Sequence, residues 1–151
     1  MYSGAGFSDW EIGDITVYIH NGEYHLFHLI IPNHDYIAHA VSKDGLAWRR
    51  TKNAIFVGDP GEWDDDMLWT MHVFSKKNKF FMYYTGLQRV DKGINSRIGL
   101  AESDDLLHWN KVKGTQLPID LKNGYYECLD DNPIVVAPNT RVLCRHRQSS
   151  I

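Results

Sequence analysis

The feature that most constrains the fold is an internal repeat. Residues 17–28 have the pattern of a strand, a polar turn and an aromatic strand, and residues 73–84 repeat that order. Residues 37–48 and 98–109 form a second matching pair, in which a third strand leads into a Ser-x-Asp-x-Leu-x-Trp turn and then a fourth strand. Units of about 40–50 residues with four strands each are typical of β-propeller blades.

Local turn chemistry supports the repeat. Asn21-Gly22 predicts a two-residue hairpin, because both residues tolerate the positive φ of a type I′ turn. One carboxylate, Asp14, precedes the first strand of that hairpin. In the Ser-x-Asp-x-Leu-x-Trp turn, the short side chains can bond nearby N–H groups. We expect the Leu and the Trp that follow to fill the gap between neighbouring blades.

No segment sustains a helical period of 3.6 residues, so the chain is predicted to be all-β. Two blades cannot close a ring. We therefore interpret residues 1–137 as the N-terminal part of a larger propeller, with a third blade beginning near Pro133. Residues 138–151 are polar and basic and contain no aromatic residue, and we interpret them as an irregular tail outside the blade pattern.

Composition excludes several classes of partner. The net charge is −3 and no long basic run precedes the tail, which argues against nucleic acid. No run of eighteen apolar residues predicts a membrane span, and the N-terminus shows no secretion signal. Cys128 and Cys144 match no zinc or redox spacing, and no metal or cofactor motif is present. The aromatic content of 13% fits a packed β core or a surface that stacks on sugar rings.

Residues 21–28 followed by residues 39–48 resemble the first blade of glycoside hydrolase family 32, which includes invertases, fructosidases and levanases. Its members carry a Gly-x-Tyr-His-Leu-Phe strand and a His-Ala-x-Ser-x-Asp-x-x-x-Trp turn in this order. The related family 43 shares the five-bladed propeller. The resemblance implies a five-bladed β-propeller that cleaves glycosidic bonds, with a fructoside, an arabinoside or a xyloside as substrate.

The resemblance also implies roles for two carboxylates. In family 32 the nucleophile is the Asp of a first-blade Asn-Asp-Pro-Asn-Gly motif, and family 43 uses an Asp there as a base. Asp14 matches by position, without the Pro and the flanking Asn residues. The general acid of the family is a Glu followed by Cys. Glu127-Cys128 matches that dipeptide but comes earlier than in the family, and the Arg-Asp-Pro motif of the second carboxylate has no match.

Glycoside cleavage requires two carboxyl groups, one ionised to attack or to activate water, the other protonated to help the leaving group depart. The inner strands of propeller blades bring carboxylates that are far apart in sequence around one axis. We expect Asp14 to be the ionised partner and Glu127 the acid. The alternatives are a solvated turn residue for Asp14 and an exposed loop residue for Glu127.

Residues 59–72 are a second concentration of functional side chains, at the entry to the inner strand of the second unit. Aromatic rings stack on sugars, and His or Asp bonds the hydroxyls. The substrate-binding candidates are Trp63, Asp66, Trp69 and His72. The acidic residues here lack the spacing of a calcium-binding loop, and we interpret most of them as solvent-exposed loop residues.

Other functions remain open on the sequence. The chain could belong to a propeller that binds carbohydrate without cleaving it, or it could be an inactive fragment. A structural interaction propeller unrelated to sugars is a third alternative.

Overall fold

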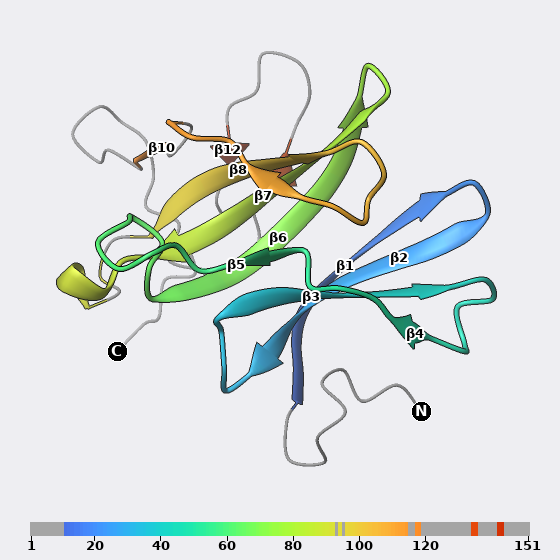
Figure 1. Cartoon of the computed structure of the whole chain (residues 1–151), viewed down its shortest axis with the longest axis horizontal. Coiled ribbons are helices and arrows are strands. Elements are labelled where there is room, and N and C mark those ends of the chain that lie inside the picture. The colour runs from blue at the N-terminus through green and yellow to red at the C-terminus, as the bar shows by residue number, and fades with distance from the viewer. Residues whose placement is uncertain are drawn as a thin grey trace.

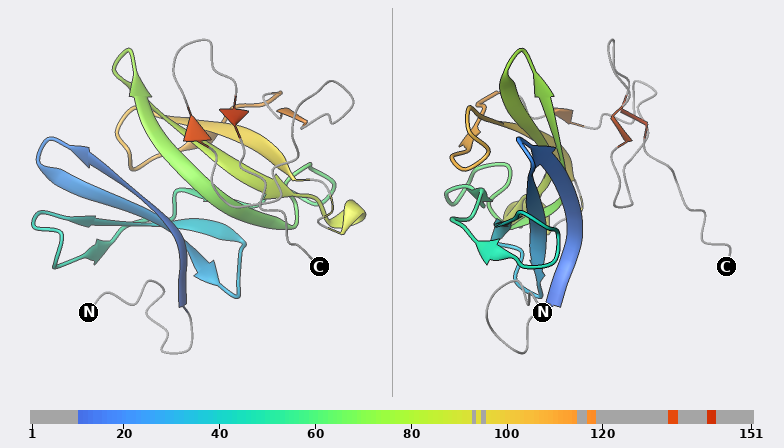
Figure 2. Two further views of the ribbon diagram at one scale, coloured as in Figure 1. Left: turned by 180° about the vertical axis from the view of Figure 1, so that it is seen from behind. Right: turned by 90° about the vertical axis from the view of Figure 1, so that its right-hand side faces the viewer.

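The computed structural model describes residues 11–92, 94, 96–114, 117–118, 134–135 and 142–143. Within these residues the chain is all-β apart from one 3₁₀ turn, η1 (Arg89–Asp91), which confirms the predicted class. Two antiparallel sheets lie beside each other and diverge, as Figures 1 and 2 show. The strands are β1 (Glu11–His20), β2 (Glu23–Ile31), β3 (Tyr36–Ser42), β4 (Arg49–Arg50), β5 (Ile55–Phe56), β6 (Met67–Lys76), β7 (Lys79–Leu87), β8 (Arg97–Ser103), β9 (Asn110–Lys111), β10 (Leu117–Pro118), β11 (Ile134–Val135) and β12 (Val142–Leu143).

Each sheet is a meander that corresponds to one predicted unit. The first sheet, blade 1, has the order β1-β2-β3-β4, with β5 also paired to β3. The second, blade 2, has the order β10-β8-β7-β6, with β9 also paired to β8. A short third pair joins β11 to β12, and β12 lies beyond residue 137. The boundary at residue 137 stays a prediction.

The hairpins close as the repeat predicts. Asn21 and Gly22 have φ values of 50° and 75°, and β1 pairs with β2 up to His20 and Glu23. In blade 2, Lys77 and Asn78 occupy the corresponding positions with φ values of 51° and 62°. Positive φ at both central residues matches the right-handed twist of the flanking strands.

The first strands of the two blades share a bulge. The pairing register of β1 shifts between Ile12 and Ile15, and that of β6 shifts between Trp69 and Met71. In each case the inner strand gains one residue over its partner. A bulge bends the strand and turns one side chain out of the regular alternation. Asp14 lies at the first bulge and Thr70 at the second.

The main core lies between the blades and contains side chains from both. Phe27 of β2 is fully buried and meets Trp109 edge-on, with ring centroids 5.6 Å apart. Tyr18 of β1 contacts Phe80 of β7 in the same way at 5.7 Å. These contacts hold the two sheets together as one hydrophobic unit.

The Ser-x-Asp turns form as expected, but the predicted role of the leucine is wrong. The side chains of Ser103 and Asp105 accept bonds from the backbone N–H groups that follow them. The motif leucines, Leu46 and Leu107, are 83% and 39% exposed. The buried side chain is Leu106, because its left-handed backbone, with φ of 66°, turns it into the core. The prediction for Trp109 is confirmed, since it packs against the core.

Replacing Leu106 should therefore be costly. Leu106→Ala removes a fully buried side chain without changing the left-handed backbone, and should lower the free energy of unfolding by about 2–4 kcal/mol. Leu46→Ala, on the exposed motif leucine of blade 1, should stay within about 0.5 kcal/mol. Urea titration of both variants measures the difference, and equal losses would contradict the assignment of Leu106 as the plug.

Three histidines are buried in blade 1. His25 Nδ1 lies 3.1 Å from His39 Nε2, and the His39 ring stacks on Phe27 at a centroid distance of 4.3 Å. Burial lowers the pKa of His25, His28 and His39, and the pKa of His39 falls to about 3. The neutral forms of these rings are therefore part of the folded core.

The folded chain should lose stability in mild acid. The unfolded chain takes up protons at these histidines below about pH 6.5, whereas the folded core resists protonation, so unfolding is favoured as the pH falls. His39 alone should lower the free energy of unfolding by about 2 kcal/mol between pH 7 and pH 5. Denaturation curves across this range measure the slope. His39→Gln should flatten it, and an unchanged slope would contradict the assignment.

Candidate active site

Asp14 lies at the bulge of β1, half-buried, with one oxygen held by the second blade. The hydroxyl of Thr70 donates to Oδ2 of Asp14 over 2.6 Å. Thr70 is 6% exposed, so this donor is shielded from water. The other oxygen, Oδ1, receives no hydrogen bond from the described residues. One oxygen is therefore fixed and the other is left for a ligand or a water molecule.

The two bonded residues are equivalent positions of the repeat. They are 56 residues apart in the chain. The same separation relates the hairpin turns at Asn21 and Lys77. Since β1 and β6 are the first strands of their blades and lie against each other, the bond joins the inner strands of the two blades. In a propeller these strands surround the central axis.

A histidine from blade 1 fixes the start of β6. The backbone N–H of Leu68 donates to the carbonyl of His34 over 2.9 Å, and Nδ1 of His34 donates back to the Leu68 carbonyl over 3.3 Å. The His34 ring stacks on Trp69 at 4.7 Å, with an interplanar angle of 19°. Sequence reasoning missed His34, because nothing in its local pattern marks a loop residue that contacts another blade.

The acidic loop before β6 is largely internal. Asp64 is 1% exposed and accepts hydrogen bonds from the Tyr84 hydroxyl, over 3.0 Å, and from the Lys111 ammonium. Burial and the neighbouring Asp64 charge raise the pKa of Tyr84 well above its usual range. Trp63 stacks on Tyr84 at 5.7 Å.

Asp65 anchors the same loop from its other side. Its carboxylate accepts from the backbone N–H of Arg89 over 2.8 Å and of Gly61 over 2.7 Å. These bonds lower the pKa of Asp65, the one from Arg89 most strongly. The interpretation of the acids as loop solvation is therefore wrong for Asp64 and Asp65, which bond to protein groups. Asp66 is half-buried and faces the Arg89 guanidinium at 3.6 Å.

Comparison with known proteins identifies the family. The model of the glycosyl hydrolases family 32 N-terminal domain matches residues 14–126. The chain belongs to that family. The match begins at Asp14, the residue that the structure bonds to Thr70. No curated protein matches the chain in sequence.

Solved structures show the fold of this family 32 domain. A family 117 glycoside hydrolase of the marine bacterium Zobellia galactanivorans matches with a TM-score of 0.63 and 17% identity, over 77% of this chain and 41% of its own. Fructan 1-exohydrolase IIa from Cichorium intybus matches with a TM-score of 0.59 and 23% identity, over 72% of this chain and 22% of its own. A thermostable family-43 glycoside hydrolase matches with a TM-score of 0.58 and 23% identity, over 75% of this chain and 36% of its own. The family 32 domain described here thus forms the first two blades of a five-bladed β-propeller and spans less than half of each of these proteins.

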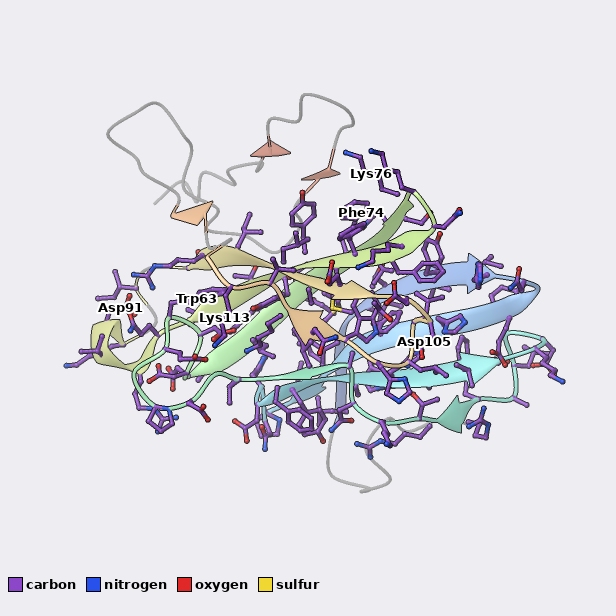
Figure 3. The ribbon with its side chains drawn as sticks, turned by 45° about the horizontal axis from the view of Figure 1, so that its top comes forward. Trp63, Phe74, Lys76, Asp91, Asp105 and Lys113 are labelled. Carbon is purple, nitrogen blue, oxygen red and sulfur yellow. The ribbon has the colours of Figure 1, made fainter. Side chains whose placement is uncertain are left out.

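The site residues predicted from the sequence of this family 32 domain do not form one cluster in the structure. Trp63 packs on the blade 1 side of blade 2, against Tyr84. His72 pairs with Tyr83 and stacks near Phe74, on the opposite face of blade 2. Figure 3 shows Trp63 and Phe74 well apart. Asp66 and Trp69 stand at the start of β6, close in sequence to Thr70, and Glu127 lies outside the described residues.

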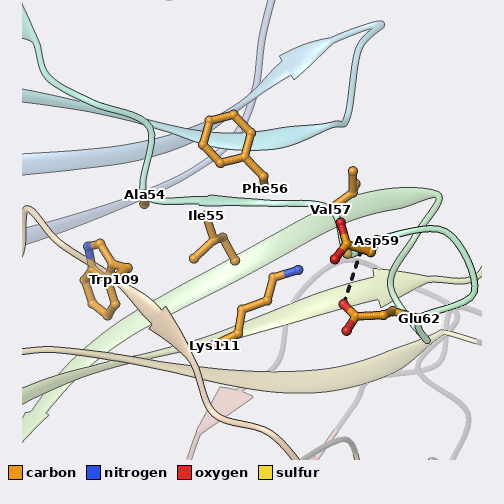
Figure 4. Close-up of a pocket in the computed structure, with 9 residues that line it drawn as sticks. Ala54, Ile55, Phe56, Val57, Asp59, Glu62, Trp109 and Lys111 are labelled. Carbon is orange, nitrogen blue, oxygen red and sulfur yellow. Dashed lines mark hydrogen bonds between the residues drawn. The ribbon is translucent and has the colours of Figure 1, made fainter.

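An open pocket of about 270 Å³ lies at the outer strands (Figure 4). The residues that line it include Ile55, Phe56, Asp59, Glu62, Trp109 and Lys111. Because β5 pairs with β3, two strands away from β1, this pocket is separate from Asp14.

No metal or membrane feature emerges from the described part of the chain. It contains no group of three or more His, Cys, Asp or Glu residues placed to hold a metal ion. Within the same residues, no helix could span a membrane.

Asp64 should matter for stability. Asp64→Asn removes the buried charge that accepts hydrogen bonds from Lys111 and from the Tyr84 hydroxyl, and should lower the free energy of unfolding by about 2 kcal/mol. Asp59→Asn, in the same loop but exposed, should stay within about 0.5 kcal/mol. Thermal or urea unfolding separates the two, and equal stabilities would show that Asp64 is a solvated loop residue after all.

Proposed function

We propose that the propeller containing this chain hydrolyses glycosidic bonds, with Asp14 as the ionised carboxylate. The observation that carries the proposal is the position of Asp14. It sits on a bulge of the inner strand of blade 1, half-buried, with one oxygen bonded across to blade 2 and the other without a donor among the described residues. Bulges next to active sites commonly aim a functional side chain. Membership of a glycosidase family makes carbohydrate cleavage the matching chemistry.

The Asp14 carboxylate has two possible uses. As a nucleophile, it attacks the anomeric carbon and forms a covalent glycosyl-enzyme that water then hydrolyses. As a base, it removes a proton from a water molecule that attacks the anomeric carbon from the opposite side of the departing group. The distance to the acid decides between them, since retention needs about 5–5.5 Å between the carboxyl groups and inversion needs more.

Glu127 is the proposed acid. What supports it is the family resemblance, since Glu127-Cys128 matches the dipeptide of the family's general acid. In this role the Glu127 carboxyl group would protonate the leaving oxygen.

The start of β6 is the proposed substrate-binding edge. Trp69 offers an aromatic ring beside Thr70, and Asp66 offers a half-buried carboxylate for sugar hydroxyls. Trp63 and His72 lie on opposite faces of blade 2, and their role in substrate binding stays a prediction. The proposed substrate is a fructoside, an arabinoside or a xyloside. Proteins of similar fold include a fructan exohydrolase and a family 43 β-xylosidase/α-arabinofuranosidase crystallised with xylotriose.

A carbohydrate-binding propeller without turnover is the second candidate. The chain lacks an Asn-Asp-Pro-Asn-Gly motif around Asp14, and no Arg-Asp-Pro motif occurs among its residues. In that case the residues at the start of β6 would still bind sugar, and Asp14 would accept a hydroxyl proton as a hydrogen-bond partner only.

Substitution of Asp14 separates these candidates. In the complete propeller, Asp14→Asn keeps the shape and removes the charge, so hydrolysis of a panel of aryl fructosides, arabinosides and xylosides should fall by at least about 10³-fold. Sugar binding, measured by calorimetry, should persist. Asp104→Asn, an 80% exposed acid of blade 2, serves as the control.

Retained turnover in Asp14→Asn would reject the catalytic role of this carboxylate. No turnover in the unaltered propeller, with sugar binding intact, would favour the binding protein. Glu127→Gln in the same assay should abolish cleavage of poor leaving groups more than of activated aryl glycosides, as expected for a lost general acid.

A further inference from the structure

We infer that Thr70 is the positioning residue of the site, which fixes and orients the Asp14 carboxylate through its hydroxyl. The inference rests on the proposed function of Asp14 and adds a role for blade 2. In this role Thr70 acts through the Asp14 carboxylate, which it bonds. The geometry supports it at four points.

The contact is short and shielded. The 2.6 Å separation between Thr70 Oγ1 and Asp14 Oδ2 is at the short end for an O–H···O bond, as expected when the acceptor is charged. Thr70 is 6% exposed, so water does not readily replace the hydroxyl as donor. A hydrogen bond to an ionised group in such surroundings is stronger than one in water.

The Thr70 side chain is aimed by the backbone. The bulge of β6 adds Thr70 between Trp69, which pairs with Thr85, and Met71, which pairs with Tyr84. In a regular strand, Trp69 and Met71 would lie on one face and Thr70 on the other. With the extra residue, Trp69 lies on the same face of the sheet as its partner Thr85, and Met71 lies on the opposite face with its partner Tyr84. Thr70, between them, directs its hydroxyl toward β1.

The strand that carries Thr70 is held from both sides of the bulge. His34 of blade 1 bonds to both backbone groups of Leu68. The backbone N–H of Asp66 donates to the carbonyl of Leu87 over 3.0 Å, and Met71, beyond the bulge, is 3% exposed in the core. Threonine is also restricted at χ1 by its branched Cβ. The donor is thus oriented before any substrate binds.

This arrangement gives the two carboxylate oxygens of Asp14 different roles. With Oδ2 bonded to Thr70, Oδ1 is the oxygen that attacks or takes a proton. Loss of the hydroxyl would let the carboxylate rotate about χ2, and small misplacements of a reacting group are costly in rate.

The test compares Thr70→Val and Thr70→Ser in the complete propeller, with the same glycoside panel. Thr70→Val removes the donor but keeps the branched shape, and should lower kcat by about 10–100-fold with KM changed less than about threefold. Thr70→Ser restores the hydroxyl and should recover most of kcat.

Thr51→Val is the matched control. It also deletes a threonine hydroxyl that bonds to a neighbouring strand, from Thr51 Oγ1 to the His39 carbonyl over 3.0 Å, but on the far side of β2 and β3 from Asp14. It should cost a similar amount of thermal stability and leave kcat unchanged. If Thr70→Val does not fold, Thr70→Ala, which lacks the hydroxyl and adds no bulk, gives the same reading.

The outcomes separate the two proposals. If Asp14→Asn abolishes turnover while Thr70→Val and Thr70→Ala stay within about twofold of the unaltered kcat, the role of Thr70 is overturned and that of Asp14 stands. Loss of kcat in Thr70→Ser equal to that in Thr70→Val would likewise overturn it, since the hydroxyl would not be the active feature. Full turnover in Asp14→Asn would reject the proposed catalytic role of Asp14, and with it the positioning role of Thr70.

Discussion

The hydrogen bond between Asp14 and Thr70 is the interaction on which the arrangement of this site depends. It exists because two strands 56 residues apart in the chain carry the same bulge, and because the blades pack with those bulges facing each other. A carboxylate and a hydroxyl that would each point away from the other in regular strands are brought within 2.6 Å. The repeat thus provides two equivalent positions, and the different residues at them provide an acceptor and its donor.

The rest of blade 2 keeps that donor in place. Asp64 and Asp65, buried before β6, bond to β7, β9 and the start of η1, so the loop that leads into β6 is tied to three other segments. His34 then ties the beginning of β6 to blade 1. Charged groups in this loop are costly to bury unless each is paired, and here the pairing partners are also the supports of the strand. The bonds that satisfy these acids therefore also fix the loop that leads to the bulge.

Much of this fold could be predicted from the sequence, because its signals are local. The Asn21-Gly22 hairpin and the Ser-x-Asp turns depend on φ values and on bonds within a few residues. Other features depend on contacts between distant residues and could not be predicted. Leu106 points inward and Leu107 outward because of one left-handed residue. Asp64 is buried because Lys111 and Tyr84 reach it, and neighbouring residues in the sequence show no sign of this. The repeat places Asp14 and Thr70 at equivalent positions, 56 residues apart, but the sequence does not show the bulges that bring the two side chains into contact.

The exposed face of blade 1 shows where a further blade would pack. Ile15, Val17 and Ile19 lie on one face of β1 and are 61%, 47% and 59% exposed, although they alternate with residues that face blade 2. An apolar face of this kind beside the inner edge is what a ring of blades would cover. The chemistry has the same requirement, since one carboxylate cannot be ionised for attack and protonated for the leaving group at once. Closing the ring would cover that face, and in the proposed mechanism it would also bring the second carboxyl group toward Asp14, so the same step would complete the fold and the proposed pair.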